Sequence, residues 1–268
     1  MTYADLLREV YPGLAPTVGD LYLLEAHQIA DLPVRAPGPE LAAVLHAHPD
    51  VRGFLVARYP QIEGFLATLM AEHNPAGEGD LATYEQAVVW ELADWIVYQR
   101  APELYDSATS VDWDLTAVTE IADLEGKSVI DAGAGTGRVA FGVSPHAHHV
   151  YAIEPVATLR RYMREKAIRL RVRNLFVVDG FLSALPFPPA SADVLITCQA
   201  IGWSLSDELS EIDRVVKPGG FALHLFGASS VTEADNPLFD ALAARGYQPD
   251  TYRDGGMLIR RFWKRIGG

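Results

Sequence analysis

The spacing of hydrophobic residues divides this chain into two parts with different periodicities. Up to about residue 100, apolar side chains recur at the spacing of amphipathic helices, without the alternation that is typical of strands. Asp80 is expected to cap one helix, and Pro33, Pro37 and Pro39 are expected to mark a loop. The predicted helices cover residues 2–10, 21–30, 49–72 and 80–100.

From Lys127 onward, short apolar runs alternate with helical segments. Such an alternation is typical of a parallel sheet that is covered by helices on both faces. The turn Asp254-Gly255-Gly256 lies between two strand-like runs and predicts a closing antiparallel hairpin. The predicted strands are 128–133, 149–155, 175–180, 192–198 and 221–227, and the predicted helices are 137–144, 156–170, 207–216 and 234–245.

These patterns predict an α/β fold with a doubly wound, mostly parallel seven-stranded sheet and a C-terminal antiparallel hairpin. An all-helical region precedes the sheet. We place the helical region at residues 1–95 and the sheet domain at residues 96–268. A composition with 49% hydrophobic and 21% charged residues is typical of a globular protein, and a length of 268 residues suits one large domain or a main domain with a smaller attachment.

Charge and cysteine content narrow the possible partners. The formal net charge of -13 disfavours nucleic acid. The Arg-rich run 160–173 is interpreted as a solvated helix face, with a phosphate-bearing substrate or tRNA as the alternative. The single Cys excludes an intramolecular disulfide. Because neither a signal peptide nor a run of about 18 apolar residues is present, we expect a soluble, cytoplasmic protein without membrane partners.

The residues with the clearest chemical meaning follow the first predicted strand. The sequence VIDAGAGTGR places Gly133, Gly135 and Gly137 at alternate positions between a strand and a helix. Glycine lets the backbone turn sharply and approach a ligand closely. The free amides at the start of the helix then favour an anionic or carboxylate group of that ligand. A tight turn without any ligand is the structural alternative.

Two neighbouring residues distinguish between possible ligands. The dinucleotide fingerprint G-x-G-x-x-G is not matched, because Arg138 stands where its last glycine would be. Asp131, which ends the first strand, would repel a pyrophosphate but can orient a cationic ligand directly or through water. S-adenosylmethionine carries an ammonium and a sulfonium group. The pattern therefore favours this molecule over NAD.

The loop VIDAGAGTGR resembles the first motif of the class I (Rossmann-like) S-adenosylmethionine-dependent methyltransferases. The segment LPFPPASADVLIT is similar to the family's approach to its fourth strand, and IDRVVKPGGFALHLF to its next helix, turn and fifth strand. RAPELYD resembles the segment before the core of ubiquinone/menaquinone-type small-molecule methyltransferases. The motifs follow the family's order over roughly residues 96–268, which is more specific than any single motif.

This resemblance implies which residues bind S-adenosylmethionine. Glu154 matches the acid that binds both ribose hydroxyls, and Asp179 matches the acid that contacts the adenine amino group, with Phe181 or Leu182 over the ring. Tyr105 either closes over the methionine end or packs a helix end against the sheet. The expected cofactor-binding residues are Tyr105, Asp131, Ala132, Gly133, Gly135, Gly137, Glu154, Pro155, Asp179, Gly180, Phe181, Cys198 and Gln199.

The residues after the fourth predicted strand differ from the motifs of two classes of methyltransferase. Amide- and base-N-methylating enzymes show Asn or Asp there, then Pro-Pro and an aromatic residue, whereas this chain reads CQAIGW over 198–203. Thr197 precedes Cys198, so the Pro-Cys pair of DNA cytosine methylation is missing and Cys198 is expected to be a small buried residue. Trp203 is the candidate substrate contact, because ligands of open α/β sheets bind at the carboxyl edge.

The sequence assigns no general base and no metal site. His224 lies within the fifth predicted strand and is expected in the core, while His46 and His48 lack a further ligand. Transfer from an activated sulfonium needs mainly proximity and in-line orientation. We therefore predict a methyltransferase that acts on an O, N or C nucleophile of a small molecule, with the helical region covering the substrate side. A non-catalytic S-adenosylmethionine-binding module and a NAD-dependent oxidoreductase are the alternatives.

Overall fold

The computed structural model describes residues 2–73, 80–108, 114–227, 236–254 and 257–267. Internal contacts divide the chain into two units, Met1–Thr109 and Ser110–Gly268, which are described separately below. The boundary expected at residue 95 lies inside helix α8 (Ala93–Arg100). Trp95 and Ile96 of this helix are buried in the core of the first unit, and this packing is why the division falls later in the chain.

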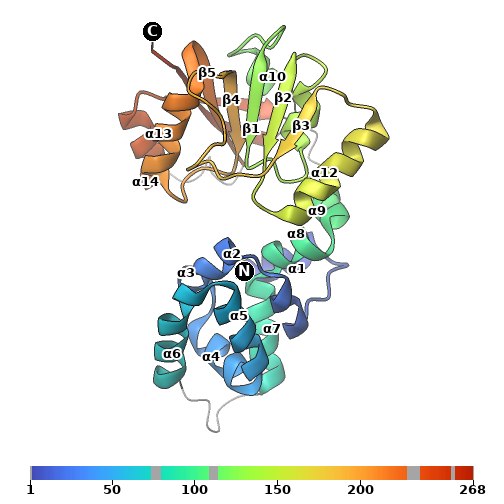
Figure 1. Cartoon of the computed structure of the whole chain (residues 1–268), viewed down its shortest axis with the longest axis vertical. Helices are drawn as coiled ribbons and strands as arrows, with labels where there is room; N and C mark the ends of the chain where they lie inside the picture. Colours follow the sequence, from blue (N-terminus) through green and yellow to red (C-terminus); the bar gives the residue numbers. More distant parts are fainter. Residues whose placement is uncertain (1, 74–79, 109–113, 228–235, 255–256, 268) are drawn as a thin grey trace. The chain divides into compact units, whose positions relative to one another are not determined.

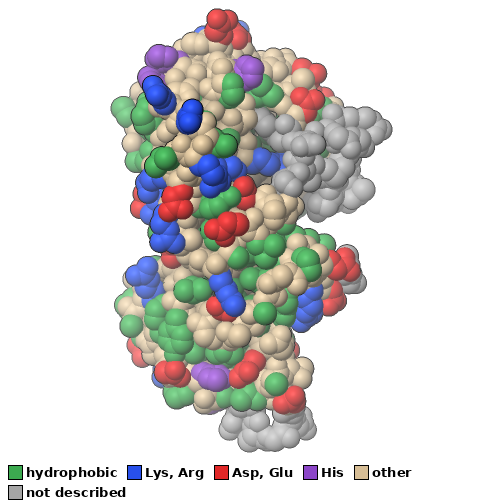
Figure 2. Space-filling model, turned by 90° about the vertical axis from the view of Figure 1, so that its right-hand side faces the viewer, with side chains coloured by type: hydrophobic (Ala, Val, Ile, Leu, Met, Phe, Trp, Pro, Cys, Tyr) green, Lys and Arg blue, Asp and Glu red, His purple; other side chains and the backbone are tan. Residues whose placement is uncertain are grey.

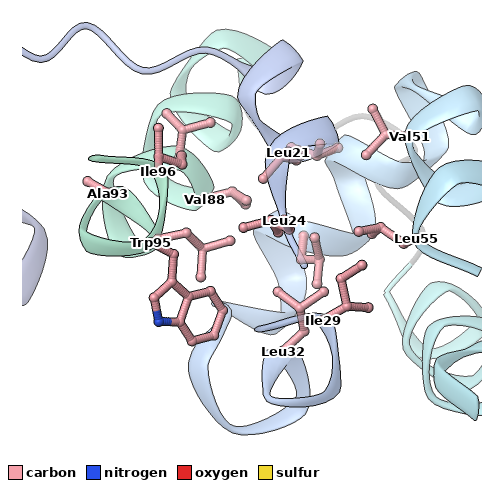
Figure 3. Packing of buried hydrophobic residues seen from close by; sticks show 14 of the residues in the cluster. Leu21, Leu24, Ile29, Leu32, Val51, Leu55, Val88, Ala93, Trp95 and Ile96 are labelled. Atoms are coloured by element: carbon pink, nitrogen blue, oxygen red, sulfur yellow. The ribbon is translucent and has the colours of Figure 1, made fainter. Parts of the chain in front are cut away.

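The described part of the first unit consists of helices around one apolar core. Leu21 and Leu24 lie at the centre of this core, and Val88 and Ile96 reach it from two later helices (Figure 3). Its elements are α1 (Tyr3–Val10), η1 (Val18–Leu23), α2 (Ala26–Ala30), α3 (Leu32–Arg35), α4 (Gly38–Ala47), α5 (Pro49–Arg58), η2 (Pro60–Ile62), α6 (Glu63–Glu72), α7 (Leu81–Glu91), α8 (Ala93–Arg100) and α9 (Pro102–Ala108).

The loop predicted around Pro33, Pro37 and Pro39 was wrong. Pro33 lies in the first turn of α3 and Pro39 in the first turn of α4, while Pro37 is the residue before α4. Proline fits these positions because the first turn of a helix has no intrahelical partner for its N–H groups. The apolar run 41–45 that follows is fully buried and makes α4 a central helix of the unit.

Two predicted long helices are interrupted in the structure. The segment 49–72 breaks at Tyr59, because the following Pro60 disfavours helical geometry in the residue before it. The segment 80–100 is divided at Leu92 into α7 and α8. The predicted cap at Asp80 is confirmed, since its carboxylate accepts a hydrogen bond from the Ala82 N–H at 3.2 Å.

The second unit contains the predicted doubly wound sheet. The seven strands lie in the order β3-β2-β1-β4-β5-β7-β6, and the first five in sequence pair in parallel (Figure 1). The predicted fold class is therefore confirmed. The strands are β1 (Ser128–Ala132), β2 (His149–Ile153), β3 (Leu175–Val178), β4 (Ala192–Cys198), β5 (Val216–Phe226), β6 (Gln248–Asp254) and β7 (Met257–Arg265).

Helices cover both faces of this sheet. Adjacent residues of β1 point to opposite faces: Val129 packs in one apolar cluster and Ile130 in the other. Residues of α10, α11 and α12 belong to the first cluster, and residues of α13 and α14 belong to the second. These helices are α10 (Thr116–Thr119), α11 (Arg138–Val143), α12 (Ala157–Leu170), α13 (Leu205–Val215) and α14 (Pro237–Ala244).

The sheet closes with the predicted antiparallel pair β6 and β7, although Gly255 and Gly256 of its turn lie outside the described residues. Arg261 of β7 is only 4% exposed and connects three elements. Its guanidinium contacts the carboxylates of Asp250 and Glu120 and donates to the Ala117 carbonyl at 2.8 Å. Because this buried cation contacts β6, Ala117 of α10 and Glu120 just after α10, it holds the antiparallel pair against α10.

We expect Asp250→Ala to lower the free energy of unfolding by about 2–4 kcal/mol, because the more exposed Glu120 is then the one carboxylate left of the two that pair with the buried Arg261. The double variant Asp250→Ala/Arg261→Met should lose less than the single variant, since the unpaired charge is then gone. Urea unfolding of the two variants checks this. Equal stability of Asp250→Ala and the parent would contradict the role assigned to the pair.

The outer face of α12 carries several arginines. Figure 2 looks onto this edge of the sheet unit and shows Lys and Arg side chains gathered there. Arg161, Arg164 and Arg169 are exposed, as a solvated face requires, but Arg160 is mostly buried, with 13% of its side chain exposed. Within the described ranges, no helix combines the length and hydropathy needed to cross a bilayer.

Candidate functional site at the carboxyl edge of the sheet

The glycine loop between β1 and α11 has the backbone that its sequence predicts. Gly133, Gly135 and Gly137 have φ values of 74°, 58° and 83°, in the left-handed region that favours glycine. The N–H groups of Gly133 and Ala134 both donate to the Ile153 carbonyl at 2.9 Å. The loop is thereby held against the end of β2.

Close packing adds a second reason for glycine at two of these positions. A Cβ atom on Gly133 would lie 2.2 Å from the Cβ of Ala200, which belongs to the loop after β4. A Cβ atom on Gly137 would lie 2.9 Å from the ring of Phe141. Two segments that are distant in the sequence therefore meet at Gly133.

Asp131 lies beneath the loop rather than on its surface. Its side chain is almost fully buried, and Oδ2 accepts a hydrogen bond from the Ala140 N–H of α11 at 2.9 Å. Burial raises the pKa of this carboxyl to about 7, although the Ala140 hydrogen bond and the nearby Arg138 favour the ionised form. Ala132, the next residue, is fully buried at the end of β1.

Glu154 connects the glycine loop to the segment after β2. Its carboxylate is 5% exposed; Oε2 accepts from the Gly135 N–H and Oε1 from the Val156 N–H, each at 2.9 Å. Burial raises the pKa of Glu154 to about 7, against the effect of these two hydrogen bonds. Each carboxylate oxygen has a further lone pair, so Glu154 can accept two more hydrogen bonds.

Asp179 follows β3 and lies at the surface, with 68% of its side chain exposed. Its Oδ1 is 2.9 Å from Nη1 of Arg160 on α12. Phe181, two residues later, is 44% exposed. Gly180 packs closely, because a Cβ atom there would lie 3.0 Å from Pro186 and 3.1 Å from Ile153.

The segment after β4 begins with Cys198 and Gln199, which line a small pocket together with Arg138 and Leu225. Cys198 is half-buried, and removal of its thiol from water raises its pKa to about 11, which disfavours a thiolate nucleophile. Gln199 has a φ of 55°, and its N–H donates to the Leu225 carbonyl at 2.9 Å.

Trp203 lies further along this segment and is 66% exposed. Its backbone is held by Glu208, a buried residue in the first turn of α13. The Glu208 carboxylate accepts from the N–H groups of Gly202, Trp203 and Ser204 at 2.7, 3.2 and 3.1 Å. An exposed indole is thus presented on a fixed backbone.

Tyr105 belongs to the helical unit. Its ring makes an edge contact with Tyr98, with 4.6 Å between the ring centroids, and it packs against the core of that unit. The contact with the cofactor expected for Tyr105 stays a prediction.

The histidines singled out from the sequence have structural partners. Nδ1 of the buried His224 lies 2.8 Å from the Thr197 hydroxyl, and burial lowers the pKa of this histidine to about 3. Nε2 of His48 lies 2.6 Å from the Glu85 carboxylate, and Nε2 of His46 lies 3.2 Å from the Met70 carbonyl. In the part of the chain that the structure describes, no group of three or more potential ligands is arranged to hold a metal.

Sequence reasoning missed Arg160 and Glu208. Arg160 was included in the solvated run, although it comes directly after the buried Leu159 at the start of α12, near the strand ends. Glu208 occupies the first turn of α13, and acids in a first turn commonly bond to free backbone amides. That position was the available signal for Glu208, whereas nothing in the sequence pairs Arg160 with Asp179.

Comparisons with known proteins identify the kind of domain that carries this site. Residues 130–224 match the model of a methyltransferase domain. The chain is 27% identical over 157 residues to an uncharacterized methyltransferase of Geobacillus kaustophilus, a match that covers 56% of this chain and 71% of the relative. It is 32% identical over 100 residues to a probable S-adenosylmethionine-dependent methyltransferase of Mycolicibacterium smegmatis, covering 37% of each protein.

The chain is therefore an S-adenosylmethionine-dependent methyltransferase with the doubly wound sheet described above. S-adenosylmethionine is accordingly its cofactor. A crystal structure of a SAM-dependent methyltransferase from Aquifex aeolicus superposes with a TM-score of 0.48 at 19% identity, covering 63% of this chain and 92% of that one.

We expect the affinity of this methyltransferase for S-adenosylmethionine to rise at least about tenfold between pH 6 and pH 8. The sequence assigns Asp131 to the cationic part of the ligand and Glu154 to its hydroxyl groups, and with pKa values of about 7 both carboxyls become ionised over this range. Calorimetric titration across this range measures the effect, and affinity independent of pH would contradict it.

The stability of the ligand-free protein should change in the opposite direction. Both folded-state pKa values lie above the ordinary values of 3.8 and 4.5, so the folded state binds more protons than the unfolded state between these limits. The resulting stabilisation is complete below about pH 4 and is lost as the pH rises through 7. Thermal unfolding of Asp131→Asn should show a weaker dependence on pH over this window.

Proposed function

We propose that this enzyme transfers a methyl group from S-adenosylmethionine to an O, N or C nucleophile of a small molecule. When bound, the cofactor supplies an activated methyl group on a sulfonium, so the protein mainly has to bind and orient the two reactants. Among the residues that the structure describes, this role fits Cys198, whose thiol has a raised pKa, and His224, which is buried, since neither is poised as a nucleophile or base.

The cofactor would lie along the carboxyl ends of β1, β2 and β3. Glu154 has lone pairs left for two ribose hydroxyls, and Asp179 has an exposed carboxylate for the adenine amino group. Phe181 has an exposed ring that can cover the base. Gly133 and Gly135 are only half-buried, so the backbone of the loop can contact the methionine part.

One observation carries the assignment of a small acceptor: Trp203 is 66% exposed although its backbone is fixed by the buried Glu208. Exposure of a large apolar ring to water does not stabilise the fold. A fixed backbone beneath the ring lowers the conformational entropy that is lost when a ligand covers it. An indole next to the carboxyl edge is suited to the flat or apolar part of a small molecule.

Release of S-adenosylhomocysteine in the presence of fractionated metabolites tests the proposed reaction. With an active fraction, Trp203→Ala should raise the KM for the acceptor at least about tenfold and leave the dissociation constant of S-adenosylmethionine unchanged. The neighbouring surface variant Ser206→Ala serves as the control. No release with any fraction, together with tight cofactor binding, would instead indicate a non-catalytic binding module. Tighter binding of NAD than of S-adenosylmethionine would indicate an oxidoreductase.

The helical unit would contribute to the choice of acceptor, and its Tyr105 to cofactor binding. The described residues of the two apolar clusters of the sheet unit begin at Leu115, so a chain that begins at Ser110 should fold. We expect this shortened chain to keep the sheet but lose turnover of the acceptor. Unchanged turnover would contradict a role in acceptor choice, and unchanged cofactor affinity of Tyr105→Ala would remove Tyr105 from the site.

A further inference from the structure

Arg160 is placed between two loops that the proposed function assigns to the cofactor. Its Nη1 donates to the carbonyl of Glu154 at 2.8 Å and to the carbonyl of Pro155. The same nitrogen lies 2.9 Å from Oδ1 of Asp179. One guanidinium therefore joins the end of β2, where the ribose acid lies, to the end of β3, where the adenine acid lies.

The burial of the two partners differs strongly. The Arg160 side chain is 13% exposed, whereas that of Asp179 is 68% exposed. An exposed carboxylate samples several rotamers unless a neighbour restrains it, and an ion pair between exposed groups usually restrains it little. Here the cation is itself held by two backbone carbonyls, so it offers Asp179 a fixed anchor.

Arginine suits this position better than lysine would. Its planar guanidinium is always charged, and the plane fixes the direction of the two N–H bonds of Nη1, the nitrogen that contacts the two carbonyls and the Asp179 carboxylate. A lysine ammonium would keep the charge without the fixed geometry. The adjacent Arg161 is exposed and makes no ion pair within the described residues, so it provides a matched comparison on the same helix.

We infer that Arg160 is a positioning residue for the adenosine half of the cofactor. It holds the Asp179 carboxylate in the orientation that accepts the adenine amino group and fixes that carboxylate relative to the Glu154 loop. This inference rests on the proposed role of Asp179. Arg160 itself need not touch the cofactor, and its effect is selectivity for adenine over a base that lacks the 6-amino group.

The test compares two ligands: S-adenosylhomocysteine and its deaminated analogue S-inosylhomocysteine, in which a 6-oxo group replaces the 6-amino group and N1 carries a hydrogen. The carboxylate of Asp179 attracts the 6-amino group of the first and repels the 6-oxo group of the second. Calorimetry of the full-length parent protein should give a ratio of dissociation constants of about 100 in favour of S-adenosylhomocysteine. A variant that is only less stable should bind both ligands more weakly by the same factor. The ratio of the two dissociation constants then stays unchanged.

We expect Asp179→Asn and Arg160→Met each to lower the ratio to about 10 or less, and the double variant to lower it no further. Arg160→Lys should recover part of the selectivity, and Arg161→Met should keep the parent ratio. A normal ratio in Arg160→Met together with a reduced one in Asp179→Asn would overturn the inference and leave the proposed function intact. A parent protein without selectivity would overturn the role of Asp179, and the inference with it.

Discussion

Replacing Glu154 with alanine should weaken the binding of S-adenosylmethionine at least about 100-fold, because it removes the two charge-assisted hydrogen bonds to ribose that we propose for this carboxylate. The same change removes the acceptor for the Gly135 and Val156 N–H groups, which hold the glycine loop to the segment after β2. We expect a further loss of about 2 kcal/mol in the free energy of unfolding. Calorimetry and urea unfolding measure the two effects separately.

Asp193 offers a matched control for this prediction. Its carboxylate also accepts a backbone hydrogen bond, from the Ser128 N–H at 2.9 Å, but at the opposite end of β1. Asp193→Ala should therefore lower stability while keeping cofactor affinity. If Glu154→Ala binds the cofactor as tightly as Asp193→Ala does, Glu154 is not the ribose acid, and the residue would have only its structural role.

Replacing Gly133 with alanine should lower the free energy of unfolding by about 2–5 kcal/mol and abolish detectable cofactor binding. Two costs combine at this position. The φ of 74° is strained for any residue with a Cβ atom, and that atom would lie 2.2 Å from the Cβ of Ala200. Relief of this overlap requires the glycine loop or the segment after β4 to move, and both belong to the proposed site.

Gly126 separates the two costs. It has a similar φ of 70°, but an added Cβ atom would meet nothing within 4 Å. Gly126→Ala should therefore cost only the backbone strain, about 1–2 kcal/mol, and should leave binding intact. The difference between the two variants measures the contact with Ala200. Equal losses in Gly126→Ala and Gly133→Ala would contradict a tight contact between the two loops.

The sheet was predictable because its signals are local. An apolar run that is buried on both faces, as in Ala192–Cys198, identifies a parallel strand without reference to any other part of the chain. The helical unit was harder to predict, since prolines both end and begin helices. Pro60 interrupts the segment 49–72, whereas Pro39 lies in the first turn of α4 in a segment that had been interpreted as a loop.

The sequence by itself predicted the methyltransferase activity, the cofactor and the strand ends of the proposed site, because the Gly133–Gly137 loop and the acids after β2 and β3 have fixed places along the chain. Only the tertiary structure decided how these pieces meet. The contacts of Glu154 with Gly135, of Arg160 with Asp179 and of Gly133 with Ala200 join residues separated by 19 or more positions. Such pairings depend on strand order and on the burial of each side chain, and neither is encoded in the local spacing of residues.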